Sequence, residues 1–254
     1  MRVLVSTFMT ICLVALPTQR GSAEPRVALR GEGYVGYSIL ELESLEEDAF
    51  QGGGAGSASV VLDRWYLQGD VFGDYMDFDL ADSEIVGGGG HAGWRDAERG
   101  SAGWVGTYNY QDTGDLDLWR TGFEGELFLD RVTVMANAGY SEADGEGAAY
   151  LDAGLSFYPI DRARIQAHAG GYALEEDDRF VLVGAGGELL VANPVAAFVR
   201  WDAMIFDGPF DLDQHSIVAG MRLYWGAEEA TLRSYDRSHF KDSCLGLLLA
   251  GRFC

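Results

Sequence analysis

The chain has 254 residues, of which 35 are glycine and 12% are aromatic, and its formal net charge at pH 7 is −22. Such an acidic chain is unsuited to nucleic acid, which binds basic surfaces. Three cysteines do not make a disulfide framework, and the length suits one large β domain or two ordinary domains.

The first 23 residues have the composition of a secretory signal peptide. Arg2 precedes an apolar run over 3–17, and the small residues of 21–23 suit a cleavage site. Removing 1–23 deletes two arginines and no acid, so the formal charge changes from −22 to −24. No later run reaches the roughly 18 apolar residues that a membrane helix needs. We therefore expect an exported protein that does not span a membrane by helices.

From Arg26 onward, clusters of turn residues divide the sequence at short, regular intervals, which is typical of an all-β barrel or sandwich. The pattern predicts twelve strands, at about residues 27–39, 55–62, 64–74, 83–95, 101–111, 115–128, 131–141, 148–158, 161–173, 179–191, 194–206 and 215–226. Most are longer than the typical strand of about 5–6 residues. They are long enough to cross a bilayer, for which a tilted strand needs roughly 9–11 residues.

Each predicted strand has one apolar and one polar face, because successive side chains of a strand point to opposite sides. Val132, Val134 and Ala136 alternate with Thr133 and Asn137, for example. Several strands carry charges in mid-strand on the polar face, which does not suit a soluble interior. We interpret the apolar face as facing lipid and the polar face as lining a lumen. The alternative is a soluble exported β-sandwich, whose buried face would give the same alternation.

Aromatic residues gather near the strand ends on the apolar face, where a membrane barrel carries its interfacial girdles. They include Trp65, Tyr75, Tyr110, Tyr140, Phe157 and Trp225.

Two kinds of connection alternate along the chain. One kind is short and mostly contains arginine: 62–64, 95–100, 129–131, 158–162 and 191–195. The other kind carries 21 Asp or Glu and no Lys or Arg: 40–53, 75–82, 111–117, 141–147, 174–178 and 206–214. Two ends in different environments are typical of an up-and-down membrane barrel. We expect the short turns to face the periplasm and the acidic loops to face outside.

Lipid leaves no backbone group unpaired, so a sheet that faces lipid must close on itself. The sequence therefore predicts an all-β fold: a closed up-and-down antiparallel transmembrane β-barrel of about 12 strands, formed by residues 24–226.

Five stretches resemble a family of small porin-like outer-membrane barrels from Gram-negative bacteria. They are "HAGWRDAERG" (91–100), "YPIDRARI" (158–165), "ANPVAAFVRW" (192–201), "AGMRLYWG" (219–226) and "TLRSYDR" (231–237). The resemblance implies the barrel fold and a location in the bacterial outer membrane. It implies no settled substrate, so no catalytic or ligand residues can be carried over.

Charged residues on the polar faces define a candidate lumen. We expect it to be lined by Arg30, Glu32, Arg64, Asp70, Arg120, Glu124, Glu126, Asp152, Arg164, His168, Glu188, Arg200, Asp202 and Arg222. Its six arginines and seven acids nearly balance. We interpret this balance as a narrow pore for the passive diffusion of small solutes. The alternative is a salt-bridged interior in a non-conducting structural or surface-interaction barrel.

The chain shows no sign of catalytic machinery. It contains neither G-x-S-x-G nor H-E-x-x-H, and we expect no enzyme activity and no cofactor. The expected partners are outer-membrane lipid, lipopolysaccharide and small solutes, and nucleic acid is not among them. The acid spacing in 76–82 and 112–117 is one that divalent cations such as Ca²⁺ would accept, although neither stretch is a full Ca²⁺ loop.

The last predicted feature is a C-terminal tail over 227–254 on the periplasmic side. Residues 244–254 also alternate, but a thirteenth strand would break the even count usual for bacterial single-chain barrels. We therefore expect the barrel to close between 215–226 and 27–39. Arg233, Arg237, Lys241 and Arg252 are expected to draw the tail toward the acidic rest of the molecule. Cys244 and Cys254 could be bridged there.

Overall fold

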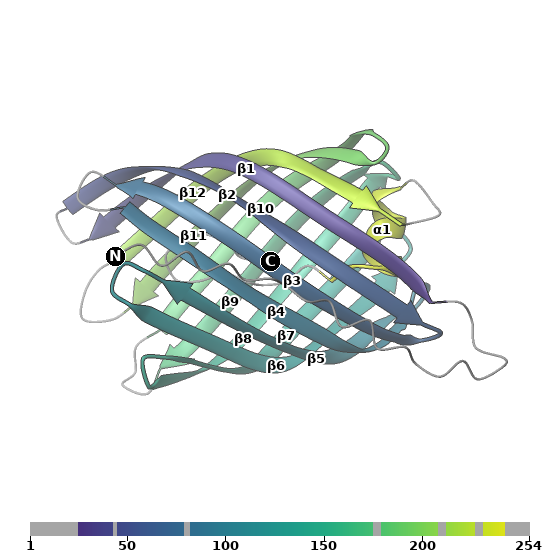
Figure 1. Cartoon of the computed structure of the whole chain (residues 1–254), viewed down its shortest axis with the longest axis horizontal. Helices are drawn as coiled ribbons and strands as arrows, with labels where there is room; N and C mark the ends of the chain where they lie inside the picture. The colour runs from purple at the N-terminus through teal and green to yellow at the C-terminus, as the bar shows by residue number, and fades with distance from the viewer. Residues whose placement is uncertain are drawn as a thin grey trace, which may run out of the picture.

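The computed structural model describes residues 25–42, 45–78, 82–174, 179–207, 212–226 and 231–241. They form twelve β-strands and one short helix (Figure 1). The strands are β1 (Arg26–Leu42), β2 (Leu45–Leu62), β3 (Trp65–Phe78), β4 (Asp82–Asp96), β5 (Gly100–Gln111), β6 (Leu116–Leu129), β7 (Val132–Ala143), β8 (Glu146–Ile160), β9 (Ala163–Leu174), β10 (Arg179–Ala192), β11 (Val195–Asp207) and β12 (Leu212–Trp225). The helix is α1 (Leu232–Ser238).

The strands form one closed barrel in which each strand pairs antiparallel with its neighbours in the chain. The seam joins β1 to β12, from Leu29 opposite Trp225 to Leu42 opposite Leu212. The predicted fold class, strand number and point of closure are therefore confirmed.

The two faces of the wall have the polarity that a membrane requires. On β7 and β8, Val134 and Leu155 are 38% and 46% exposed on the outside. Their neighbours Thr133 and Ser156 point inward and are buried. A soluble sandwich buries the apolar face and exposes the polar one, so the soluble alternative is wrong. Most of the predicted girdle lies on the outside, with Trp65 68% and Trp225 46% exposed.

The strands extend further into the acidic connections than the sequence pattern indicates. The predicted loop 40–53 is wrong, because β1 runs to Leu42 and β2 starts at Leu45. Acidic residues at 46–48 and Gly-Gly at 52–53 have low strand propensity. Pairing with β1 keeps this segment extended, as in the bond from Ser38 to Gln51 (2.8 Å).

The turns are tight at both ends wherever the structure describes them. Asp63 and Asp130 adopt positive φ in the two-residue turns after β2 and β6. At the opposite end, Asp144 and Gly145 have φ of 51° and 87°, which suits a two-residue hairpin. The two ends therefore differ in charge more than in length, and we refer to them as the arginine-turn end and the acidic end.

The described part of the tail does not form a strand. Residues 231–241 contain α1, which lies at the arginine-turn end beside the termini of β1 and β12 (Figure 1). Within the ranges described above, no helix has the length and apolarity that a transmembrane helix needs. Arg252 and the predicted bridge between Cys244 and Cys254 fall outside the described residues.

Candidate functional site

The structure places all but one of the predicted lumen side chains on the inner face of the wall. Eight of them are buried: Asp70, Arg120, Asp152, Arg164, Glu188, Arg200, Asp202 and Arg222. Five are partly exposed: Arg30, Glu32, Glu124, Glu126 and His168. Arg30 donates to Ser57 (3.3 Å), and the other side chains have the inner-face partners described below.

Arg64 is the exception, and its predicted place in the lumen is wrong. It lies with Asp63 in the turn between β2 and β3, and its side chain is exposed. Simple alternation puts it on the same face as Tyr66, and its carbonyl still accepts from the Arg95 amide (2.7 Å), but its side chain is exposed at the rim of the barrel. The inner face of β3 begins at Tyr66 instead, which is buried.

Toward the acidic end, Arg120 of β6 forms a compact cluster with two tyrosines and one acid. Its guanidinium donates to Asp152 (2.5 Å) and to the Tyr172 hydroxyl (2.7 Å). The same group lies 4.0 Å from the centre of the Tyr150 ring, a cation–π distance. One cation is therefore held by partners on two neighbouring strands, β8 and β9.

Near mid-barrel, a second pair lies on β11. Arg200 Nε donates to Asp202 (2.5 Å), and the other Asp202 oxygen lies 3.4 Å from His168 Nε2 on β9. Gly184 of β10 lies between these two side chains, and a Cβ at this position would lie 2.3 Å from His168 and 2.5 Å from Asp202. Only glycine leaves room for this contact across β10.

The densest network lies toward the arginine-turn end, around Glu188 of β10. One Glu188 oxygen accepts from Arg164 and Arg222, both at 2.7 Å. The other accepts from the Tyr224 hydroxyl at 2.8 Å. Arg222 also donates to Glu32 (2.6 Å), so the network crosses the seam between β12 and β1.

A fourth group joins β3, β4 and β6 on the opposite side of the barrel. His91 lies between two carboxylates, 3.0 Å from Asp70 and 2.8 Å from Glu124. Glu124 also accepts from the Tyr66 hydroxyl. Sequence reasoning did not place His91 in the lumen, although it falls on the polar face of β4.

The inner face is not polar throughout. Near the acidic end it carries one apolar cluster with Phe72, Met76 and Ile85 and another with Leu182 and Met204. Polar side chains nevertheless lie on the inner face toward both ends of the wall. On β5 they are Ser101 at the arginine-turn end and Thr107, Asn109 and Gln111 toward the acidic end, with Gly103 and the buried Val105 between them.

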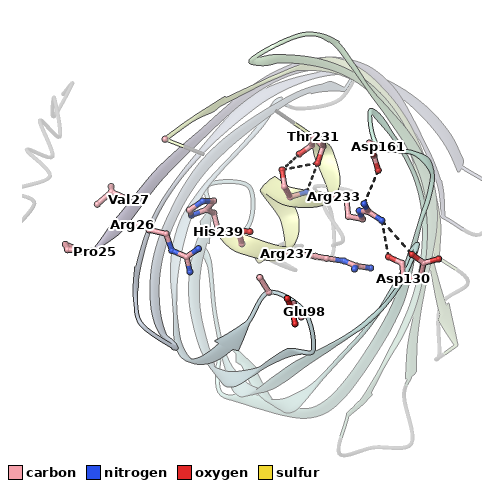
Figure 2. A pocket seen from close by; sticks show the side chains of 14 residues that line it. Pro25, Arg26, Val27, Glu98, Asp130, Asp161, Thr231, Arg233, Arg237 and His239 are labelled. Carbon is pink, nitrogen blue, oxygen red and sulfur yellow. Dashed lines mark hydrogen bonds and ion pairs between the residues drawn. The ribbon is translucent and has the colours of Figure 1, made fainter. Parts of the chain in front are cut away.

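Residues 231–241, which we call the plug, occupy the lumen at the arginine-turn end (Figure 2). Thr231 caps α1 by accepting a hydrogen bond from the Ser234 amide (3.1 Å). Leu232, Tyr235 and Phe240 form one buried cluster with four wall residues: Ala28, Leu190, Ala196 and Tyr224. The Tyr235 and Tyr224 rings stack 4.5 Å apart.

Polar contacts bind the plug to opposite sides of the wall. Asp236 accepts from Arg164 of β9 (3.0 Å) and from the Tyr158 hydroxyl of β8 (2.9 Å). Across the barrel, the Lys241 amide donates to Gln68 of β3 (2.8 Å), and its ammonium lies 3.6 Å from Glu124. The tail was expected on the periplasmic side, but its position within the lumen was not.

Arg95, like Gln68, is a wall residue that binds the plug backbone. Its guanidinium donates to the carbonyls of Asp236 and Phe240, both at 2.8 Å, and to Glu126 at 2.9 Å. These bonds satisfy the free carbonyls that follow a helix C-terminus. The sequence pattern put Arg95 at the boundary between the strand 83–95 and the connection 95–100, whereas β4 runs to Asp96.

A pocket of about 1060 Å³ opens between the plug and the rim of the barrel. Its rim carries Glu98, Asp130 and Asp161, and Arg233 of the plug reaches Asp161 (3.1 Å) and Asp130 (3.9 Å), as Figure 2 shows. These ion pairs are exposed, so they contribute little to docking. No group of His, Cys, Asp and Glu that could hold a metal ion occurs among the described residues.

The sequence matches no family model and no curated protein. Solved structures, in contrast, share the fold. The NanC porin is 7% identical to this chain with a TM-score of 0.56, and the match covers 75% of this chain and 98% of that one. The KdgM porin in complex with disordered oligogalacturonate is 8% identical with a TM-score of 0.51, over 75% and 98%.

The translocator domain of the autotransporter NalP from Neisseria meningitidis is also similar. It is 11% identical with a TM-score of 0.54, and the match covers 78% of this chain and 88% of that domain. At such low identity these likenesses show a shared fold and nothing finer. The fold of this chain is that of an outer-membrane β-barrel similar to porins.

Proposed function

We propose that the protein is an outer-membrane channel of the porin type, through which small hydrophilic solutes diffuse passively. The observation that carries the proposal is the polarity of the inner face at both ends of the barrel and near its middle. Ser101 and Arg222 lie at the arginine-turn end, Arg200 and Asp202 near the middle, and Gln111 and Gln214 at the acidic end. A barrel that served only as a rigid body has no need of this polarity, because an apolar interior would be as stable. The fold shared with porins supports the same function.

The wall charges favour a channel of low intrinsic selectivity. Arg120 faces Asp152, Arg200 faces Asp202, and Glu188 faces two arginines. Because each of these arginines has an acid beside it, these sites present dipoles rather than isolated charges. The orientation, with the acidic end outside, the outer-membrane lipid partners and the absence of enzyme activity are parts of this proposal.

A non-conducting structural barrel is the second candidate, and the plug favours it. Contacts from both sides of the wall hold residues 231–241 across the arginine-turn end. In a barrel of eight strands, side chains fill the interior, whereas a barrel of sixteen strands encloses an aqueous channel. A barrel of twelve strands lies between these two cases. In this candidate the plug is permanent.

Ion conductance of the full-length protein in planar bilayers separates the two candidates. We expect discrete current steps, together with liposome swelling in small sugars. The informative variant is the full chain with Leu232→Ser, Tyr235→Ser and Phe240→Ser, which removes the apolar anchors of the plug and leaves the wall intact. If this variant folds and inserts but passes no current, the channel proposal is wrong.

A further inference from the structure

We infer that the plug is a gate: residues 231–241 leave the lumen as a unit while the barrel wall stays closed and folded. This inference rests on the proposed channel function for its consequence. Its structural content, a plug that undocks from an intact wall, is independent of conductance and can be tested separately.

The hydrogen bonds between the backbones of the barrel strands do not involve the plug. The seam pairs β1 with β12, and residues 231–241 contribute no strand to any described sheet pairing. Within the described residues, a single hydrogen bond between two backbone groups joins the plug to the wall, from the Leu232 amide to the Asp161 carbonyl (3.0 Å). The plug's other backbone bonds are internal, such as Tyr235 to Thr231 (3.1 Å) and His239 to Tyr235 (3.1 Å).

The wall charges that contact the plug are also paired without it. Arg164, which binds Asp236, also binds Glu188 (2.7 Å). Glu124, which lies near Lys241, also accepts from His91 and Tyr66.

The same holds for three other wall residues. Arg30, which donates to the Lys241 carbonyl (3.4 Å), also donates to Ser57 (3.3 Å). Glu126 has Arg95 at 2.9 Å and Ser101 at 2.7 Å, besides Lys241 at 3.7 Å. Arg95 in turn keeps Glu126 when it loses the plug carbonyls.

This redundancy distinguishes a removable plug from a structural one. Removing one partner of a buried ion pair is strongly destabilising because it leaves an uncompensated charge in a poorly solvated place. Here the departure of Asp236 and Lys241 leaves no such charge on the wall, and water that enters the lumen solvates the freed ends of the plug.

The apolar anchors set how often the plug leaves. Leu232, Tyr235 and Phe240 are 0%, 2% and 2% exposed, and they cover Ala196, which is fully buried. Losing these contacts is the main cost of undocking, since apolar burial is the dominant favourable contribution in such contacts. β12 ends with Trp225 at the arginine-turn end, and the plug follows it in the chain, so the plug leaves by that end.

A cysteine reporter on the wall tests the inference without measuring current. Ala196→Cys is placed in the full-length chain with Cys244→Ser and Cys254→Ser, and its modification by a membrane-impermeant thiol reagent is timed in detergent and in liposomes. We expect slow but complete modification. The triple variant Leu232→Ser, Tyr235→Ser and Phe240→Ser is expected to accelerate it at least about tenfold, since it deletes buried side chains.

Two controls bracket this result. Ala148→Cys reports an inner-face position on β8 toward the acidic end, away from the plug, and its rate is expected to be the same in both backgrounds. Ser238→Ala changes a plug residue that lies at the pocket and outside the apolar cluster, and it is expected to leave the rate at position 196 unchanged.

The outcomes separate this inference from the channel proposal. Faster modification at 196 with increased current supports both. Faster modification without current supports the mobile plug and contradicts the channel. An unchanged rate at 196 in a folded triple variant overturns the inference, even where current is observed. A triple variant that loses its heat-modifiable band on gels also overturns it, because the wall then depends on the plug.

Discussion

On the outside of β7 and β8, Val134 and Leu155 stand opposite each other, 38% and 46% exposed, with no polar partner to satisfy. On the inside of β10, Glu188 accepts hydrogen bonds from Arg164, Arg222 and Tyr224, which belong to other strands. A lipid-facing residue needs only an apolar side chain, whereas each charged residue of the inner face depends on particular hydrogen-bond partners. The effect of a substitution therefore depends on polarity at the outer face and on specific contacts at the inner face.

The largest effect is expected at the centre of the inner network. Glu188→Ala leaves Tyr224 without its acceptor and removes a shared partner of two arginines, so we expect a loss of about 3–5 kcal/mol in the free energy of unfolding. The measurement is the temperature at which the folded gel band converts to the unfolded one. Glu188→Gln keeps an acceptor oxygen and should lose less. Equal melting of the Ala variant and the wild type would contradict a specific inner face.

The next effect is expected on the outer face. Ala138→Arg puts a charge into lipid near the middle of β7 and should cost about 2–4 kcal/mol, with impaired membrane assembly. Asn137→Arg, on the inner face of the same strand, has water or acids within reach and should be much milder. Equal tolerance of the two substitutions, measured as the yield of heat-modifiable protein in membranes, would refute the assignment of the faces.

A third prediction concerns pH and the plug. Burial, with Arg26 and Arg95 nearby, lowers the pKa of His239 to about 4 from a usual value of 6.5. The docked plug therefore holds neutral His239, and its docking is fully stable above pH 6.5 and weakens as the pH falls from 6.5 toward 4. Modification of Ala196→Cys should accelerate about tenfold between pH 7.5 and pH 5, after correction for thiolate content. His239→Gln should abolish this dependence, and a slope that persists in it would assign the effect to another group.

Ion selectivity should show a smaller effect that distinguishes the two ends. At the acidic end, Asp112, Asp115 and Asp117 lie in the segment 111–117, which joins β5 to β6, and this segment contains no Lys or Arg. Such a mouth concentrates cations, so we expect a cation preference of a few-fold in reversal potentials at low salt. Neutralising these three to Asn should reduce it, and screening at 1 M salt should remove it. Anion preference would mean that the paired wall, not the mouth, sets selectivity.

The smallest effect is a conservative change on the outer face. Leu155→Val keeps an apolar side chain toward lipid and should change stability by no more than about 0.5 kcal/mol. A large loss, measured by the same gel conversion, would show that outer residues also depend on specific neighbours.

The difference between the faces also explains what the sequence could predict. A period of two is a local property, so the barrel, its twelve strands and the inward direction of Arg120 or Arg222 were predictable from neighbouring residues. The start of β2 was not, because Glu46 and Glu47 are extended only through pairing with β1. The exposure of Arg64 was also not predictable, because the alternation puts its side chain on the inner face although the residue lies in the turn before β3.

The networks and the plug were beyond sequence reasoning for a related reason. His91 and Glu124 lie on strands that are not adjacent, and no spacing in the chain brings them together. For the plug a local signal did exist: Thr231 is a good N-cap, and Leu232 and Tyr235 are spaced by three, as on one side of a helix. That signal predicts a helix, but its place in the lumen depends on wall residues from both ends of the chain.

The seam between β1 and β12 has a consequence for how the protein assembles. Residues such as Leu29 and Trp225 meet only after the whole barrel sequence has been delivered, so closure is a late event with a high cost in loop entropy. The surface that receives Leu232 and Phe240 is shared between Ala28 of the first strand and Tyr224 of the last. That surface does not form until β1 has paired with β12. Docking of the plug therefore marks the completion of folding, and an incompletely closed chain is left with its apolar tail residues unburied.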